Sequence, residues 1–280
     1  MADDDSATEI SDTSSAINHQ RNIIVLCHNV SQDTADGIFD VNNLLKGRID
    51  VLTRCITSSL WRSNNIRSDT TVYLLLFPHN ITVQVRGSCM RSLTPDERTT
   101  ALYLQRTLWR DSYSDNTTLT TPQKRNTTNQ QSTQMSDEKK IRMEVKGRNK
   151  LIDRIRTAHK RKKPLQGFIS HRNDTLQARL EQIVNEDDEH TVYMLSETGD
   201  LLWDVLEENT KLTAKKNNGQ GRSRRTITLI LGNQVGYSAD DENLLLQSPI
   251  VQEVSLGPLS LLTSQCITIT HHYLDRYESL

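Results

Sequence analysis

Three junctions between a strand and the loop after it carry the residues best suited to hold a small molecule. They are Leu195-Ser196-Glu197-Thr198-Gly199, Leu231-Gly232-Asn233-Gln234-Val235-Gly236 and Ser255-Leu256-Gly257-Pro258-Leu259. In an open α/β sheet, ligands bind beyond the carboxyl ends of the strands, and glycine there lets a ligand approach the backbone closely. The second and third junctions contain no charged side chain, so they suit an adenosine-like ligand better than a phosphate. Each glycine alone is typical of an ordinary turn, whereas the three junctions together indicate a binding site.

The sequence contains none of the common signatures of catalysis. There is no G-x-S-x-G nucleophile turn, no H-E-x-x-H zinc motif, no phosphate loop ending in G-K-[S/T] and no G-x-G-x-x-G after a strand. His271 and His272 are adjacent on a predicted helix, so they point about 100° apart and cannot share a metal; we expect one to be buried and the other exposed. The four cysteines form no C-x-x-C pair, which argues against a zinc ribbon or a disulfide framework and predicts free thiols. We therefore expect no bound metal.

Hydrophobic patterning predicts alternating strands and helices, which is typical of an α/β protein with a mostly parallel sheet. Short apolar runs predict strands at 23–27, 72–77, 81–85, 167–170, 191–195, 226–231 and 250–254. Helical periodicity and capping signals predict helices at 49–63, 94–109, 175–184, 239–246 and 259–273. The second and third strands are joined by Pro78-His79-Asn80, which predicts a hairpin.

Two of these helices begin with charged or capping residues. For the helix at 94–109, Thr94 can cap, Pro95 suits the first helical position and Glu97 can close a capping box. In the helix at 49–63, Asp50 and Arg54 lie one turn apart on the face opposite the apolar one. A surface ion pair is one interpretation of these two side chains.

Composition divides the chain into a folded part and two polar segments. The 280 residues suffice for one or two domains, and a mean hydropathy of −0.60 is low for a chain folded throughout. Residues 1–21 are acidic and polar, which predicts a disordered tail. From 111 to 136, 18 of 26 residues are Ser, Thr, Asn or Gln, and 139–163 carries 12 Lys or Arg against two acids. We therefore predict a single domain, formed by 22–110 and 164–280, that is interrupted by a mobile insertion at 111–163 with at most a short helix around 151–155.

Charge and targeting signals restrict the partners. The net charge of −1 does not indicate any class of partner. No apolar run approaches the roughly 18 residues of a membrane helix, and the acidic N-terminus is neither a signal nor a transit peptide, so we expect no membrane partner and a cytoplasmic location. The cations of 139–163 could hold RNA phosphates without sequence preference. The alternatives are a solvated linker, or a nuclear-import patch at Lys160 to Lys163.

Five segments match a known family in order and spacing. They are Gly47-Arg48-Ile49-Asp50-x3-Arg54, Leu93-Thr94-Pro95-Asp96-Glu97-Arg98, Leu231-Gly232-x3-Gly236, Ser255-Leu256-Gly257-Pro258-Leu259 and Gln265-Cys266-Ile267-Thr268-Ile269 ahead of Leu274-Asp275. Together they resemble the archaeal tRNA pseudouridine-54 N1-methyltransferases of the SPOUT superfamily, over roughly 22–110 and 164–277. The resemblance implies an α/β domain whose C-terminal part forms a trefoil knot, an exception to the rule against threaded chains. It also implies a homodimer that acts on RNA, with tRNA favoured by the first two segments.

The resemblance assigns S-adenosylmethionine to the knot loops. The first cofactor strand would end at Leu195, Gly232 would lie at the second junction, and the third junction would wrap the adenosine. The cofactor-binding residues implied in this way are Leu195, Gly232, Leu256, Gly257, Pro258, Leu259, Ser260, Leu261 and Cys266. A core thiol is the other interpretation of Cys266.

The resemblance places substrate contacts where the helix at 49–63 begins. Methylation at N1 of pseudouridine needs a group that accepts the N1 proton and cations that stabilise the developing uracil anion. Asp50 is the candidate base, and Arg48 and Arg54 are candidate partners of the anion or of a phosphate. The role of Arg98, which could pair with a neighbouring acid, stays open.

The sequence departs from the family at the second junction. The relatives read Gly-Asp-His-[Ile/Val]-Gly, whereas Asn233 and Gln234 stand here in place of the acid and the imidazole. The histidine expected shortly before the cysteine is Leu262 or Thr263. Amides can keep hydrogen bonds while losing charge, so activity could be weakened. The main hypothesis is an S-adenosylmethionine-dependent tRNA pseudouridine N1-methyltransferase. The alternatives are an rRNA pseudouridine N1-methyltransferase, a catalytically silent RNA-binding protein on the same scaffold, and an unrelated nucleotide-binding α/β protein.

Overall fold

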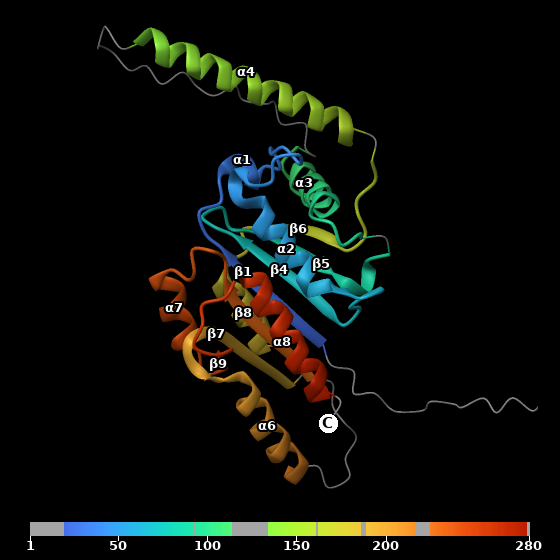
Figure 1. Ribbon diagram of the computed structural model, residues 1–280, viewed down its shortest axis with the longest axis vertical. Helices are drawn as coiled ribbons and strands as arrows, with labels where there is room; N and C mark the ends of the chain where they lie inside the picture. The colour runs from blue at the N-terminus through green and yellow to red at the C-terminus, as the bar shows by residue number, and fades with distance from the viewer. Residues whose placement is uncertain are drawn as a thin grey trace, which may run out of the picture.

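A computed structural model describes residues 20–91, 93–113, 134–160, 162–185, 189–216 and 225–278 (Figure 1). Nearly all of the tail predicted at 1–21, and most of the polar segment at 111–136, lie outside the described residues. The basic segment and the candidate site residues lie within them, apart from Arg161.

A seven-stranded sheet forms the centre of the molecule, in the order β6-β5-β4-β1-β8-β7-β9. Neighbouring strands from β4 to β9 are parallel, whereas β5 and β6 add two antiparallel pairs at one edge. The strands are β1 (Gln20–Cys27), β4 (Thr70–Leu76), β5 (Ile81–Arg86), β6 (Phe168–Arg172), β7 (Glu189–Leu201), β8 (Arg225–Gly232) and β9 (Val251–Ser255). A separate antiparallel pair joins β2 (Trp61–Arg62) to β3 (Asn65–Ile66). The predicted α/β class, mostly parallel sheet and hairpin are confirmed.

Helices cover both faces of the sheet because the central strand is apolar on both faces. On β1, Ile23 and Val25 contribute to the core shared with α2, α3, α6 and α8, whereas Ile24 and Leu26 contribute to the core shared with α5 and α7. In Figure 1, α2 and α8 run side by side over the first of these faces. The helices are α1 (Gln32–Ala35), α2 (Ile49–Leu60), α3 (Glu97–Tyr113), α4 (Gln134–His159), α5 (Leu176–Asn185), α6 (Leu202–Lys216), α7 (Ala239–Leu246) and α8 (Thr263–Glu278), with 3-10 turns η1 (Lys46–Arg48) and η2 (Gly87–Cys89).

The capping box predicted at the start of α3 is wrong. Asp96 provides the cap, since its Oδ1 accepts a hydrogen bond from the backbone N–H of Thr99 at 2.7 Å. The hydroxyl of Thr94 donates to the Asp96 carboxylate and does not reach the helix. These hydrogen bonds lower the pKa of Asp96 below its ordinary value.

Other helix predictions need correction. The helix predicted at 49–63, α2, ends at Leu60, because the next two residues form β2. The helix α3 extends to Tyr113, four residues past the expected end, where the Tyr113 ring stacks on Trp109 with centroids 4.0 Å apart. The helix α6 was not among the predicted helices. The helix α8 begins at Thr263 and not near Leu259, because Gln265 Oε1 accepts from the Leu262 N–H at 3.0 Å and so caps the first turn.

The basic part of the insertion forms a 26-residue helix, α4, where the sequence predicted at most a short one. Ile152 and Ile155 on α4 are 6% and 3% exposed, and they pack with Ile38 and Trp109. This contact joins segments that are far apart in the sequence, so helical periodicity could not reveal it. The division into one domain and an insertion stays a prediction.

A buried charged cluster ties β1 to the C-terminal half of α8. The Arg21 guanidinium is 1% exposed and donates to His271 Nδ1 at 3.0 Å and to Asp275 Oδ1 at 2.7 Å. Arg67 binds the same carboxylate with two hydrogen bonds, of 2.7 and 2.6 Å. Since arginine has no acceptor, His271 accepts through Nδ1 as a neutral ring. His271 is buried and His272 exposed, as predicted.

Acidification should weaken the folded state through His271. Burial, Arg67 and Arg21 lower the pKa of His271 from 6.5 to about 3. Between these two pH values the unfolded chain binds a proton that the folded chain does not, so the free energy of unfolding falls as pH falls. Urea denaturation from pH 7 to pH 4 measures this decline. His271→Gln, which has no imidazole to protonate, should show a shallower decline, and identical slopes would contradict a neutral buried His271.

Candidate active site

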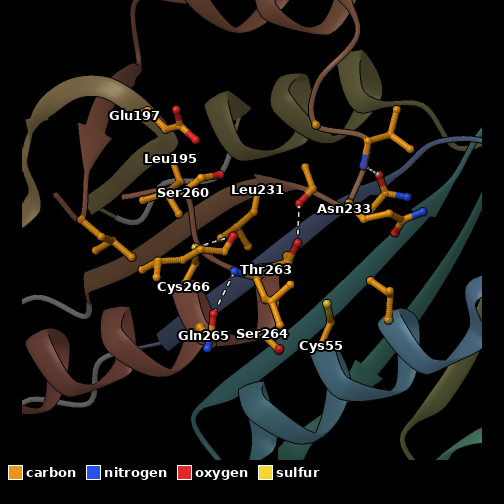
Figure 2. A pocket seen from close by; sticks show the side chains of 18 of the residues that line it. Cys55, Leu195, Glu197, Leu231, Asn233, Ser260, Thr263, Ser264, Gln265 and Cys266 are labelled. Carbon is orange, nitrogen blue, oxygen red and sulfur yellow. Dashed lines mark hydrogen bonds between the residues drawn. The ribbon is translucent and has the colours of Figure 1, made fainter. Parts of the chain in front are cut away.

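The three predicted junctions surround one cavity. The prediction that the first strand ends at Leu195 is wrong, because β7 continues to Leu201 and Ser196 to Gly199 form an irregularity in its pairing with β9, between Leu195 and Asp200. The strands β7, β8 and β9 are neighbours and parallel, so their carboxyl ends share one edge of the sheet. The cavity has a volume of about 780 Å³ and is also lined by the first residues of α2 and α8. This volume falls in the range of small-molecule sites. Figure 2 shows Leu195, Asn233, Ser260 and Cys266 at this cavity.

Glycine at position 232 allows the second junction to close tightly. A Cβ atom on Gly232 would lie 2.5 Å from the carbonyl carbon of Gly236, and backbone atoms there cannot move aside. The Gly236 N–H donates to the Asn233 carbonyl oxygen at 3.0 Å, and the Val235 N–H donates to Asn233 Oδ1 at 3.0 Å. The close turn thus depends on one glycine and one amide side chain.

The Asn233 amide uses both of its ends. While Oδ1 accepts within the turn, Nδ2 donates to the backbone oxygen of His28 at 3.0 Å, just beyond β1. These two contacts fix the orientation of the amide. An aspartate, the residue that the resemblance implies at this position, could accept from the turn but could not donate to His28. The departure from the family pattern therefore has a local structural role.

Asn233→Asp should destabilise the protein by about 1–3 kcal/mol, because the carbonyl oxygen of His28 would face an acceptor in place of a donor. The matched control is Gln234→Glu, the same chemical change at an exposed amide, which should alter the free energy of unfolding by no more than about 0.5 kcal/mol. Urea denaturation at pH 7 compares the two variants. Equal stabilities would contradict the structural role of Asn233.

The third junction turns open backbone toward the cavity. Gly257 has φ +124°, and a Cβ atom placed on it would meet nothing within 4 Å. Its N–H donates to Ser255 Oγ at 3.1 Å, which holds the turn. Thr263 Oγ1 then donates to the carbonyl oxygen of Gly232 at 2.9 Å, so the loop after β9 is fixed against the end of β8. Figure 2 shows Thr263 at the cavity, with a dashed line for this hydrogen bond.

The lining fits an adenosine-like group. Within the described part of the chain, the backbone groups of Leu259 and Ser260 have no hydrogen-bond partner, so they are available to the polar edge of a base. Apolar side chains of Leu195, Leu231 and Leu256 supply contact area for its faces. The Tyr237 hydroxyl lies 2.9 Å from the Leu195 carbonyl oxygen and 2.8 Å from that of Ile230, and so links the first two junctions.

Arg48, Asp50 and Arg54 form a connected cluster at the start of α2. Asp50 Oδ2 accepts from Arg54 Nη2 at 2.7 Å, and Asp50 Oδ1 accepts from Arg48 Nε at 3.1 Å. The Asp50 side chain is 5% exposed, whereas Arg48 and Arg54 are 50% and 35% exposed. Both arginines line the cavity, but Asp50 is not among the lining residues. The expected ion pair is present, although its acid is buried and not at the surface.

Backbone geometry brings Arg48 over Asp50. Gly47 and Arg48 have φ values of +78° and +55°, two successive left-handed residues that turn the chain sharply into α2. A left-handed conformation costs a non-glycine residue about 1–2 kcal/mol. The ion pair between Arg48 and Asp50 offsets part of this cost.

The structure distributes the other predicted site residues around the cavity. Those that line it are Leu195, Gly232, Leu256, Gly257, Leu259, Ser260, Leu261 and Cys266, whereas Pro258 is not among the lining residues. Cys266 is half-buried, between the core and the cavity, and burial raises its pKa, which favours the neutral thiol. Arg98 donates to Asn42 Oδ1 at 3.2 Å. Glu197, Gln234 and Gln265 also line the cavity, and although they lie inside the predicted segments they were not among the predicted site residues. Further lining residues without a predicted role include Val51, Cys55, Tyr237 and Ser264, whose only sequence signal was proximity to predicted site residues.

Neither a metal centre nor a membrane helix is present in the described ranges. No cluster of three or more His, Cys, Asp or Glu side chains there could hold a metal ion. No described helix is long and apolar enough to cross a membrane. The four cysteines are free thiols.

The carboxyl edge of the parallel sheet holds a glycine-rich cavity that fits an adenosine-like group, and two arginines lie beside it. These features define the class of the protein, which is an α/β protein that binds a nucleoside-type cofactor and an anionic group. A family model described as "Putative SAM-dependent RNA methyltransferase" matches residues 21–123 and 115–279. The chain belongs to this family of RNA methyltransferases, whose cofactor is S-adenosylmethionine. An unrelated nucleotide-binding protein, one of the alternatives above, is therefore excluded.

The names of individual relatives in sequence agree with this family. The tRNA (pseudouridine(54)-N(1))-methyltransferase of Methanosarcina acetivorans is 27% identical over 265 residues, which cover 92% of each chain. The protein of the same name from Methanopyrus kandleri is 27% identical over 232 residues, covering 82% of this chain and 80% of its own. Among solved structures, Archaeoglobus fulgidus Nep1 bound to S-adenosylhomocysteine aligns with 93% of this chain and 99% of its own, with 13% identity and a TM-score of 0.48.

Proposed function

We propose that the chain methylates N1 of pseudouridine in RNA, at position 54 in the T-loop of tRNA. The observation that carries the proposal is that Arg48 and Arg54, at the start of α2, line the same cavity as the open backbone after β9. A methyl donor and an anionic base could therefore meet in one cavity. The family and the printed names of the relatives support the substrate and its position.

The second and third junctions are proposed to hold the cofactor. Bound S-adenosylmethionine supplies a methyl group activated by a positive sulfonium. The backbone of Leu259 and Ser260 would hydrogen-bond to the adenine edge, with Leu256 packed on a face of the base. Glu197, the exposed acid of the first junction, offers an acceptor to hydroxyl or ammonium groups of the donor.

Arg48 and Arg54 are proposed to stabilise the substrate anion. Loss of the N1 proton leaves negative charge on the uracil ring, and guanidinium groups stabilise it by charge-assisted hydrogen bonds. Asp50 has both carboxylate oxygens engaged by these arginines. We therefore assign Asp50 to positioning the two cations, with proton acceptor as the competing assignment.

A homodimer with a knotted C-terminal segment belongs to the same proposal. Leu259 and Leu262 are 74% and 59% exposed beside the cavity, and a second copy would cover this apolar surface. The hydrogen bond from Thr263 to Gly232 supports a close crossing of the two C-terminal loops. Light scattering should give a dimer at micromolar concentration, and a monomer would contradict this part of the proposal.

Two alternatives remain distinct from the main proposal. Asn233 and Gln234 favour a catalytically silent RNA-binding protein, because charge is missing where the relatives carry an acid and a histidine. An rRNA pseudouridine N1-methyltransferase would share the chemistry but not the substrate. The proposal also includes a cytoplasmic location, in keeping with a tRNA substrate.

Calorimetric titration with S-adenosylmethionine, followed by methyl-transfer assays, separates these alternatives. We expect micromolar binding and transfer to a tRNA transcript with pseudouridine at position 54, but none to the same transcript with uridine. Transfer only to pseudouridine-containing rRNA fragments would favour the rRNA enzyme. RNA binding without methyl transfer by a folded dimer would favour the silent scaffold.

A further inference from the structure

The helix α4 is fixed to the body of the protein. Arg148 donates to Asp33 of α1, with Nη2 2.8 Å from Oδ1. His159, 6% exposed, lies 3.2 Å from Gln105 Oε1 on α3 through its Nε2, and burial, Lys162 and Arg106 lower its pKa to about 4. An uncharged His159 is therefore compatible with the apolar packing of Ile152 and Ile155 nearby. Figure 1 shows α4 beyond α1 and α3.

The opposite face of α4 carries a row of free cations. Arg142, Lys146 and Lys150, here called the cationic face, recur every fourth residue and are exposed. Lys150 lies about 160° around the helix axis from the buried Ile152, so this row points away from the body. None of the three forms an ion pair with a described side chain, whereas Asp153 is already paired with Arg156 at 3.1 Å.

The helix α4 and the cavity lie at the same edge of the sheet. The Asn233 N–H of the cavity loop donates to the Leu26 carbonyl oxygen at the end of β1, at 2.9 Å. The chain continues from this point into α1, which holds α4 through Asp33. A Cβ atom on Gly47 would lie 2.9 Å from Thr34 Oγ1, so η1 packs against α1. Along this edge of the sheet, the cavity arginines are therefore followed by α1 and then by α4.

We propose that the cationic face binds the phosphate backbone of the RNA whose target base enters the cavity. Rows of exposed Lys and Arg neutralise phosphates without reading sequence. Residues 134–160 contain no Phe, Tyr or Trp, and their one histidine, His159, is buried. Bases therefore have no exposed ring there on which to stack, which favours backbone contact over base recognition. The inference rests on the proposed function only in requiring an RNA substrate.

The test is the triple variant Arg142→Gln, Lys146→Gln, Lys150→Gln in the full-length protein, since glutamine retains good helix propensity. Its affinity for unmodified tRNA should fall roughly tenfold at 0.15 M salt, and the slope of log K against log salt should become shallower by about two to three. The matched control is Arg62→Gln, Arg86→Gln, Arg91→Gln, three exposed cations outside α4. Both variants should bind S-adenosylmethionine like the wild type.

The outcomes separate this inference from the proposed function. Weaker, less salt-dependent binding in the α4 variant alone would support the cationic face. If the wild type methylates tRNA but both variants bind it with wild-type affinity and salt dependence, the inference is wrong and the proposed function stands. Equal weakening in the two variants would also overturn it, because net charge alone would then explain binding. A wild type that binds S-adenosylmethionine but no RNA would overturn both.

Discussion

Replacing Asp50 with asparagine should lower the rate of methyl transfer by about 10²-fold, the usual effect of losing one preorganised electrostatic contact. The guanidinium groups of Arg48 and Arg54 now share the Asp50 carboxylate. An asparagine side chain would turn its amide donor toward one of these two groups, which are themselves donors. Arg48 and Arg54 would then lose their alignment at the cavity. The affinity for S-adenosylmethionine should change little, because Asp50 is not among the residues that line the cavity.

The pH profile of Asp50→Asn separates the two roles of this residue. If Asp50 positions the arginines, the loss should be the same at every pH. If it accepts the N1 proton, raising the pH should restore much of the rate, since the substrate would lose that proton to solvent. Asp153→Asn is the matched control, because Asp153 forms an exposed ion pair on α4 at 3.1 Å. It should retain the wild-type rate, in keeping with the small contribution of surface ion pairs.

Replacing Gly232 with alanine should lower the affinity for S-adenosylmethionine by at least about 10²-fold, or 2.7 kcal/mol or more. The new methyl group would lie 2.5 Å from the carbonyl carbon and 2.7 Å from the Cα of Gly236. Since these are backbone atoms, the turn itself must open and displace the cavity wall. Calorimetric titration measures the loss.

Two further variants make the Gly232 prediction decisive. Gly147→Ala is the matched control, since a Cβ atom there meets nothing within 4 Å. It should bind the cofactor normally and, as a helical position, gain up to about 1 kcal/mol of stability. If Gly232→Ala does not fold, Gly257→Trp tests the same cavity, because its indole would enter the open space in front of the third junction. Wild-type affinity in a folded Gly232→Ala variant, or in Gly257→Trp if the first does not fold, would contradict this location of the cofactor.

Local patterns were sufficient to predict the seven strands of the main sheet and the edge where the cavity lies, but not β2 and β3. A strand buried on both faces needs a mostly apolar run, which is visible at Ile23 to Cys27 and at Leu229 to Leu231. Parallel strands bring their carboxyl ends to one edge, so three glycine-bearing junctions could be grouped before any coordinates were known. Helix ends were less accurate, because Asp96 and Gln265 compete with neighbouring residues for the same backbone amides.

The amino-acid sequence by itself determined the α/β class, the three junctions and the family segments, because each depends on residue type and spacing within a few turns or strands. Tertiary structure decided the environment of each side chain. Asp50 lies on the polar side of its helix by periodicity, yet two arginines bury it. Similarly, α4 is fixed because Ile152 and Ile155 meet Ile38 and Trp109. Such contacts depend on how distant segments pack, and no local period encodes them.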